Sequence, residues 1–138
     1  MSDTFVLDSF AMLALLGNEP GSDDVADLLR RAKADQVRAL MTWVNVGEVA
    51  YIIERRWGVE RSQVALAMME ATALEMVAVG RDLAVAAAHI KASHAIAYAD
   101  AFAAALAQES AATLVTGDPE FKLLENVLKI EWLPQRVP

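Results

Sequence analysis

The chain has 138 residues with no cysteine, 56% apolar residues and a formal net charge of −7 at pH 7. This length is sufficient for one domain with its own core, and the lack of cysteine excludes a disulfide scaffold and a thiolate zinc site. The acidic balance argues against a passive nucleic-acid binder, although carboxylates that cluster around bound cations are an exception.

Signals for export or membrane insertion are not visible in the sequence. No basic N-terminal segment precedes a long apolar run, and charged residues interrupt every apolar run before it reaches membrane-spanning length. We therefore expect a cytoplasmic protein with no membrane contact. No linker, repeat or low-complexity segment divides the chain, which predicts one domain over residues 1–138.

Short apolar segments alternate with longer segments of helical periodicity along the chain. In chain order, the predicted elements are a strand over 4–7, a helix over 10–16, a helix after Ser22, a strand over 37–41, helices over 43–57 and 60–73, a strand over 74–79, helices over 82–91 and 97–111, a strand over 113–116, a helical turn over 119–125 and a strand over 128–132. The strands are too short and too apolar for half-exposed hairpins. This alternation predicts an α/β fold in which helices cover both faces of a parallel sheet.

Local signals indicate how the helices begin and which faces they bury. Ser9 and Ser22 each precede a helical pattern and are expected to act as N-caps. The helix over 60–73 has an apolar stripe that should face the core. Its members are Val64, Leu66, Ala67 and Met68.

Glu48 has an unusual position within the helix predicted over 43–57. It lies between the apolar residues Val46 and Val49, whereas other charged residues gather at the solvated end of the helix. An acid among apolar neighbours costs free energy unless it is paired or binds a metal. Asn45 lies three residues earlier, on nearly the same face. Glu48 is therefore the acid that is hardest to explain as purely structural.

Two other acids follow predicted strands and should meet at one edge of the sheet. Asp8 comes directly after the first strand and Asp118 comes after the fourth, and sites in open parallel sheets form at the carboxyl ends of strands. Asp100 opens the helix that leads into the fourth strand, and a perfectly regular layout would put that start away from this edge. Structural explanations also exist, because Asp118 suits a Gly-Asp-Pro turn and Asp100 suits the positive end of a helix.

Four acidic segments, in this order and at these separations, carry a resemblance to one nuclease family. They read FVLDSFAMLALL, WVNVGEVAYII, YADAFAAALA and LVTGDPEF. Together they look like the motifs of the PIN-domain ribonucleases, and most closely those of the small VapC-type toxins of type II toxin–antitoxin systems. The match spans essentially the whole chain. The resemblance implies a three-layer α/β/α fold in which a short central parallel sheet brings four acids into one pocket.

The resemblance also implies which residues carry the chemistry. Asp8, Glu48 and Asp100 match the three acids that hold Mg²⁺ or Mn²⁺ in the family. Asp118 matches the fourth acid, so that all four are expected to be catalytic and metal-binding. Oxygen ligands without histidine or cysteine suit Mg²⁺ or Mn²⁺ better than zinc.

Two further positions match supporting residues of the family. Thr116 matches the hydroxyl residue two places before the fourth acid, where it would orient Asp118. Asn45 matches the polar residue that often precedes the glutamate. No departure from the family pattern occurs at the acidic positions themselves.

The function that the resemblance implies is metal-dependent hydrolysis of RNA, leaving 5′-phosphate and 3′-hydroxyl ends. The implied partners are an RNA substrate, a cognate antitoxin that lies across the pocket and a second copy of the chain, which joins the first mainly through the early helices. Apolar residues over 10–16 and 49–53 would be a natural surface for such contacts. Arg55, Arg56 and Arg61 are either contacts for RNA phosphates or ordinary solvated residues.

Other functions remain open on the residues alone. A phosphatase of the haloacid-dehalogenase kind also begins with Asp after the first strand, but it needs a second Asp two residues later, where this chain has Phe10. A catalytically silent PIN-like module kept for binding would be expected to have lost at least one acid, and all four are present. His89 and His94 are five residues apart, which is a poor spacing for a zinc pair on one helical face.

Overall fold

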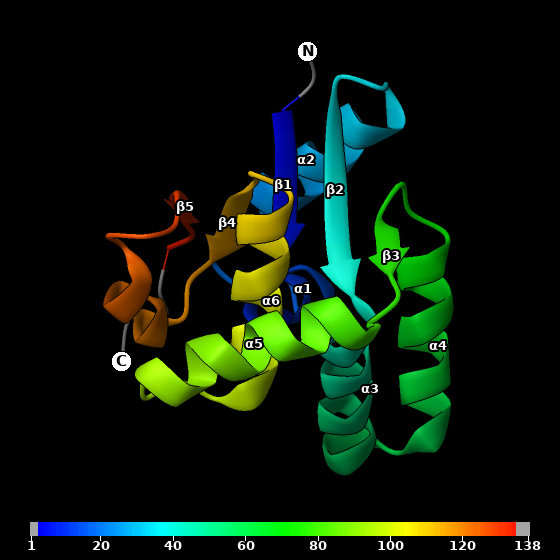
Figure 1. Cartoon of the computed structure of the whole chain (residues 1–138). Coiled ribbons are helices and arrows are strands. Elements are labelled where there is room, and N and C mark those ends of the chain that lie inside the picture. Colours follow the sequence, from blue (N-terminus) through cyan, green and yellow to red (C-terminus); the bar gives the residue numbers. More distant parts are fainter. Residues whose placement is uncertain (1–2, 135–138) are drawn as a thin grey trace.

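Five short parallel strands form the central sheet of the structure, a computed structural model that describes residues 3–134 (Figure 1). The strands are β1 (Asp3–Leu7), β2 (Val37–Thr42), β3 (Glu75–Val77), β4 (Thr113–Thr116) and β5 (Ile130–Trp132), and their order in the sheet is β3-β2-β1-β4-β5. The helices are α1 (Ser9–Leu16), α2 (Ser22–Lys33), α3 (Trp43–Trp57), α4 (Val59–Glu70), α5 (Arg81–Ser93), α6 (Tyr98–Glu109) and the 3₁₀ helix η1 (Pro119–Leu124). None of these helices is long and apolar enough to cross a membrane.

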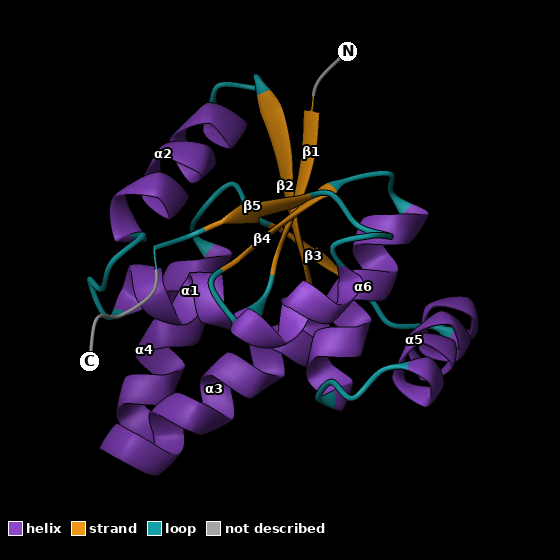
Figure 2. Ribbon diagram, turned by 90° about the vertical axis from the view of Figure 1, so that its left-hand side faces the viewer, coloured by secondary structure: helices purple, strands orange, loops and turns teal. Residues whose placement is uncertain are grey.

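Helices cover both faces of the sheet because both faces of its central strands are apolar. In β1, the side chains of Phe5 and Leu7 belong to one core cluster and that of Val6 to the other, and all three are buried. The first cluster packs against α1, α2, α3 and α4, and the second packs against α5, α6 and η1 (Figure 2). Burial on both faces explains the continuous apolar strands and confirms the predicted α/β fold.

Helix α6 crosses the second face of the sheet, and its many alanines fit this central position. Residues 100–107 are all buried, although Phe102 and Leu106 are the only large apolar side chains among them. Small side chains allow the helix to contact β1, β2 and β4 as well as α3 and α5. The helix runs opposite to the strands, so that its first residues lie at the carboxyl edge of the sheet (Figure 1).

The predicted N-caps of the first two helices are wrong. Asp8, not Ser9, caps α1, because Asp8 is the last extended residue and its carboxylate accepts a hydrogen bond from the backbone N of Ala11 at 2.9 Å. Gly21, with a φ of 94°, precedes α2, and Ser22 lies inside that helix. Glycine adopts a positive φ without steric cost, so Gly21 allows the chain to turn before α2.

The buried face of α4 also differs from the prediction. Val64 and Met68 are 58% and 55% exposed, whereas the periodic pattern placed them in the core. The buried positions are Ser62, Ala65 and Met69. The helix packs mainly against α3, where the hydroxyl of Ser62 donates to the backbone O of Ala50 at 2.8 Å. A helix with one close neighbour buries only a narrow stripe, so apolar residues beside that stripe remain exposed.

Candidate metal centre

The carboxyl ends of β1 and β4 lie side by side in the middle of the sheet, where Leu7 pairs with Val115. Asp8 directly follows β1, and Asp118 lies two residues beyond β4. The strand pairing therefore brings these two acids to the same edge of the sheet. Asp8 is 1% exposed, whereas Asp118 is partly buried.

Hydrogen bonds on both carboxylate oxygens hold Asp8 in place. Its Oδ1 accepts from the backbone N of Ala11 at 2.9 Å, and its Oδ2 accepts from Oγ1 of Thr116. The same Thr116 hydroxyl is fully buried and accepts a hydrogen bond from the backbone N of Asp118 at 3.0 Å. The Thr116 hydroxyl thus connects Asp8 and Asp118. The sequence predicted its contact with Asp118, and the structure adds the contact with Asp8.

Asp100 reaches the same edge because of the direction of α6. A helix that leads into a parallel strand runs opposite to that strand, so it starts at the carboxyl edge. The expectation that a regular layout puts Asp100 elsewhere is therefore wrong. The side chain of Asp100 is 7% exposed. Between β3 and α6 the chain forms one further helix, α5.

Asn45 joins three helix starts next to the acids. Its Nδ2 donates to the backbone O of Ala99 at 3.0 Å and to Oγ of Ser9 at 3.5 Å. Its Oδ1 accepts from Oγ1 of Thr42 at 2.6 Å. Ser9 and Ala99 are chain neighbours of Asp8 and Asp100, so that Asn45 contacts the side chain next to one acid and the backbone next to the other. The side chain is completely buried, and its bonds to Thr42 and Ser9 are made away from solvent.

Glu120 is an acid of this edge that sequence reasoning missed. Carboxylate oxygens of Asp100, Asp118 and Glu120 all lie within 4.8 Å of one another. The backbone N of Glu120 donates to Oδ1 of Asp118 at 2.9 Å, and its own Oε1 accepts from the backbone N of Ala97 at 3.0 Å. The available signal was Asp-Pro-Glu, because a proline in the first turn of a helix follows its cap directly.

Glu48 lies near this group, although it is not one of the three converging carboxylates. It is partly buried on α3, and its negative charge contributes to the raised pKa of both Asp8 and Asp100. Asp118 contributes more than Glu48 to the raised pKa of each. Glu48 therefore borders the group. We call Asp8, Glu48, Asp100, Asp118 and Glu120 together the acid centre.

Burial and mutual repulsion raise the pKa of two members of the acid centre. Burial raises the pKa of Asp8 to about 7, although hydrogen bonds from Thr116 and Ala11 act in the opposite direction. Burial likewise raises the pKa of Asp100 to about 8, and the charges of Asp118 and Asp8 add to this effect. No cation among the described residues contributes to either pKa. The acid centre consequently repels itself at neutral pH.

The donor set of the acid centre fits a hard divalent cation. All its donors are carboxylate oxygens, which Mg²⁺ and Mn²⁺ prefer, and no histidine joins the converging group among the described residues. A bound cation would also compensate for the charge that burial penalises at Asp8 and Asp100.

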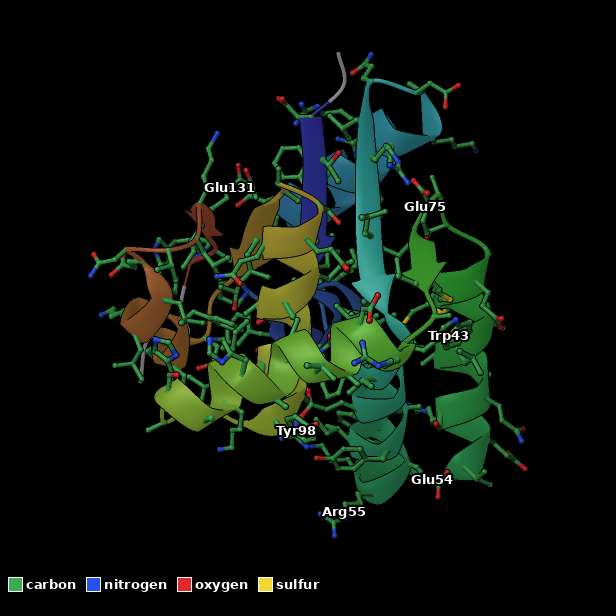
Figure 3. All side chains as sticks on the ribbon, in the orientation of Figure 1. Trp43, Glu54, Arg55, Glu75, Tyr98 and Glu131 are labelled. Carbon is green, nitrogen blue, oxygen red and sulfur yellow. The ribbon has the colours of Figure 1, made fainter. Side chains whose placement is uncertain are left out.

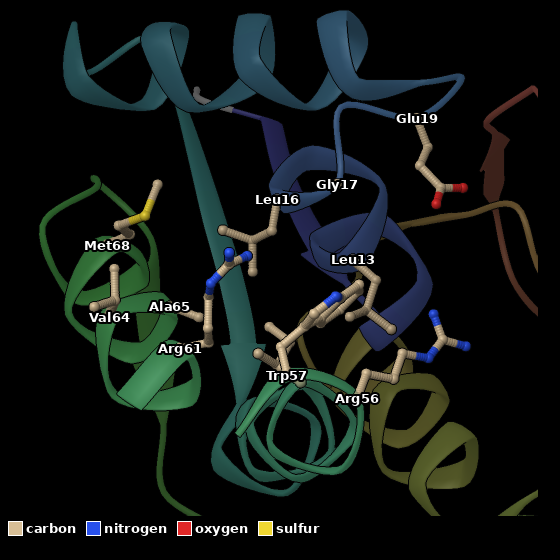
Figure 4. Close-up of a pocket in the computed structure, with 11 residues that line it drawn as sticks. Leu13, Leu16, Gly17, Glu19, Arg56, Trp57, Arg61, Val64, Ala65 and Met68 are labelled. Carbon is tan, nitrogen blue, oxygen red and sulfur yellow. The ribbon is translucent and has the colours of Figure 1, made fainter. Parts of the chain in front are cut away.

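A groove of about 430 Å³ lies between α1, α3 and α4, apart from the acid centre (Figure 4). Its large apolar lining residues are Leu13, Leu16, Ile53, Trp57, Val64 and Met68. Arg56 and Arg61 also line it. Of the surface expected over 49–53, Val49 is fully buried in the core and only Ile53 reaches this groove. We call it the α1/α3/α4 groove.

A comparison with protein families agrees with the observed fold. A family model described as the PIN domain matches residues 5–126. The match covers every member of the acid centre. The comparison with curated proteins gave no match.

Solved structures of several bacterial proteins resemble this one. VapBC2 from Rickettsia felis, bound to a DNA fragment from its promoter, is 20% identical with a TM-score of 0.74, over 95% of this chain and 99% of that chain. VapC20 from Mycobacterium tuberculosis, a toxin that cleaves the sarcin–ricin loop, is 19% identical with a TM-score of 0.70, over 96% and 100%. VapBC-5 from the same species, a member of the VapBC family of toxin–antitoxin systems, is 18% identical with a TM-score of 0.64, over 96% and 98%. At these identities the likeness concerns the fold.

Proposed function

Because this chain belongs to the PIN-domain family, we propose that it is a divalent-metal-dependent endoribonuclease and the toxin of a toxin–antitoxin pair. The observation that carries the proposal is the acid centre, in which buried, partly buried and exposed carboxylates from distant parts of the chain gather, and no cationic side chain of residues 3–134 contributes to the pKa of its two buried acids. The fold likeness to VapC and VapBC structures supports the toxin–antitoxin assignment.

The acid centre would hold Mg²⁺ or Mn²⁺ through Asp100, Asp118 and Glu120, with Asp8 and Glu48 next to them. When bound, such an ion supplies Lewis-acid activation of a phosphodiester and of an attacking water. The products would be 5′-phosphate and 3′-hydroxyl ends, as the family resemblance implies.

Residues of the chain keep the carboxylates in place and set their protonation. Thr116 bonds both to Asp8 and to the backbone of Asp118, so that these acids keep their relative position. Asn45 fixes the start of the helix that carries Asp100. Since the pKa of Asp8 is about 7 and that of Asp100 about 8, cation binding near neutral pH would displace protons from them. The affinity for the cation should therefore rise with pH.

The test of the nuclease function is cleavage of a mixed RNA pool by purified, antitoxin-free protein. Cutting should occur with Mg²⁺ or Mn²⁺, stop with excess EDTA and be lost in Asp100→Asn. Glu70→Gln is the matched control, because Glu70 is an exposed acid at the end of α4, and it should cut normally. A folded wild-type protein that binds metal but cuts no RNA would favour a module kept for binding.

The family resemblance implies an antitoxin that lies across the acidic pocket; we propose that its main contact is instead the α1/α3/α4 groove. Trp57, Val64 and Met68 are 56%, 58% and 55% exposed, which is a concentration of large apolar side chains typical of a protein-binding surface. Arg56 and Arg61 beside them favour a partner with an acidic flank. The partner that fits is an amphipathic helix, whose apolar face would enter the groove.

We further propose that the chain works in the cytoplasm as a single-domain protein and forms a homodimer. Residues of the early helices, as the family resemblance implies, would contribute most of the dimer contact. Sedimentation at decreasing protein concentration tests the dimer. A monomer at every concentration would contradict it.

A further inference from the structure

A half-exposed aromatic side chain lies at the start of the helix that carries Asp100. Tyr98 is the first residue of α6 and lies two residues before Asp100, about 3 Å along the helix axis. Its side chain is 50% exposed, at the end of the molecule where the strands have their carboxyl ends (Figure 3). The ring packs on buried Phe102, with centroids 4.8 Å apart and planes at 51°.

The backbone on both sides of Tyr98 is tied to the acid centre and its supports. The backbone N of Ala97 donates to Oε1 of Glu120 at 3.0 Å, and the backbone O of Ala99 accepts from Nδ2 of Asn45 at 3.0 Å. An exposed aromatic on a helix surface commonly has no fixed relation to a functional group. The backbone that carries Tyr98 is, by contrast, held by short contacts on both sides.

Lys91 adds a positive charge to the same segment. Although it belongs to α5, its Nζ donates to the backbone O of Ile96 at 2.5 Å, two residues before Tyr98. It is exposed and forms no ion pair with the described residues. A local cation matters on a chain whose net charge is −7. An aromatic ring next to a cationic group is the combination with which proteins bind single-stranded nucleic acid.

We propose that Tyr98 stacks on an unpaired base beside the phosphodiester to be cut, and that Lys91 contacts a phosphate near that base. The proposal rests on the nuclease function proposed above and adds the way in which the substrate is recognised. Both residues bind substrate and take no part in hydrolysis. Because the bases of an RNA duplex are stacked on each other and unavailable to the ring, the substrate must be single-stranded where it is cut.

The first test is steady-state cleavage of an unstructured RNA by the wild-type protein and three variants. Tyr98→Ala should raise KM roughly tenfold at nearly constant kcat, because the lost contact binds substrate and transition state alike. Tyr98→Phe keeps the ring and should stay within about twofold of the wild type. Val127→Ala is the matched control, since Val127 is 56% exposed and belongs to neither the acid centre nor the α1/α3/α4 groove, and it should also stay within about twofold.

A binding measurement gives a readout that does not depend on cutting. In an Asp8→Ala background, RNA with 2-aminopurine beside the cleavage site should lose fluorescence on binding, and adding Tyr98→Ala should abolish this loss. Lys91→Gln should reduce the salt dependence of binding by about one phosphate contact. The Mn²⁺ affinity of Tyr98→Ala should equal that of the wild type, which separates a lost substrate contact from a damaged acid centre.

Three results would overturn the inference and leave the nuclease function standing. An unchanged KM in Tyr98→Ala, with an active wild type, would show that the ring does not bind substrate. Weaker self-association of that variant at unchanged RNA affinity would assign the ring to a contact between copies. Equal cutting of a fully paired RNA duplex would exclude the single-stranded substrate. A wild type that binds Mn²⁺ and cuts no RNA would instead overturn the nuclease function and the inference with it.

Discussion

The acid centre and the α1/α3/α4 groove lie at the two ends of helix α1, and each contains a different kind of energetically unfavourable surface. Asp8 caps the start of α1, whereas Leu13 and Leu16 near its end line the groove. In the acid centre the unfavourable feature is buried negative charge, and in the groove it is exposed apolar surface. A cation would compensate for the first and an apolar helix for the second. Variants should therefore affect one region and spare the other.

The largest difference between the effects on RNA cutting and on antitoxin affinity is expected when the acid centre loses one charge. Asp8→Asn retains an oxygen that caps α1 but removes the carboxylate, so RNA cutting should fall by about 10²- to 10³-fold. Antitoxin affinity should change little, because the groove is untouched. Single-turnover cleavage and an antitoxin titration of the same variant check both statements. Activity within about twofold of the wild type would contradict the role of Asp8.

The opposite result, a loss of antitoxin affinity at unchanged RNA cutting, is expected from a charge in the groove. Val64→Glu puts a carboxylate on an apolar lining position, so antitoxin affinity should fall by about 10- to 100-fold while cutting by the free protein stays unchanged. Val127→Glu is the control, since Val127 is 56% exposed and does not line the groove. Equal losses of affinity in both variants would show that the antitoxin binds elsewhere.

A change of pH should act on the acid centre alone. The pKa values of Asp8 and Asp100 are raised from 3.8 to about 7 and 8, so the metal-free folded state keeps protons that the unfolded state releases. The stability that these two acids contribute is therefore fully present below pH 3.8 and is lost as the pH rises through 7 and 8, so stability falls between pH 5 and pH 8. We expect the Tm to fall by about 5 °C or more over this range.

Thermal melting with and without Mg²⁺ checks this pH dependence. Saturating Mg²⁺ should restore most of the lost stability at pH 8, because the cation compensates for the ionised carboxylates. Asp100→Asn should flatten the pH dependence of the metal-free protein. A Tm that rises between pH 5 and pH 8 without metal would contradict the raised pKa values of the two buried acids.

The smallest effect is expected at Gly117, which directly precedes Asp118 and packs against Phe10. A Cβ there would lie 2.6 Å from Cζ of Phe10, whose ring lines a second hollow that shares Leu13 with the groove. The ring must move, so Gly117→Ala should cost about 1 kcal/mol in urea unfolding and weaken both activities slightly. Gly47→Ala is the control, because a Cβ on that helical glycine meets nothing within 4 Å and should stabilise the protein.

The sheet and several helix boundaries could be predicted because they depend on local patterns. Helix α3 occupies Trp43–Trp57 as predicted, since Gly58 follows it with a φ of 96°. The face of α4 could not be predicted, because periodicity does not distinguish an apolar residue that packs in the core from one that is left on the surface. Val64 and Met68 belong to the second kind.

The acid centre was less predictable, because it depends on contacts between distant segments. Asp8 and Asp118 follow strands, so their common edge can be inferred from a parallel sheet alone. The position of Asp100 can be predicted only from the direction of α6, and reasoning from strand ends assigned that direction wrongly. Glu120 requires η1 and a hydrogen bond to Ala97, which lies 23 residues away in the chain. Its sequence neighbourhood resembles any turn that contains proline.

The claim that the acids form a divalent-metal centre is tested most directly by calorimetric titration of Mn²⁺ into metal-free protein at pH 7. Buffers of different ionisation enthalpy measure the protons released on binding. We predict saturable binding with proton release, because the pKa of Asp8 is about 7 and that of Asp100 about 8, and a loss of both signals in Asp100→Asn. A folded protein without saturable binding, or binding that Asp100→Asn leaves unchanged, would contradict a metal centre built from these acids.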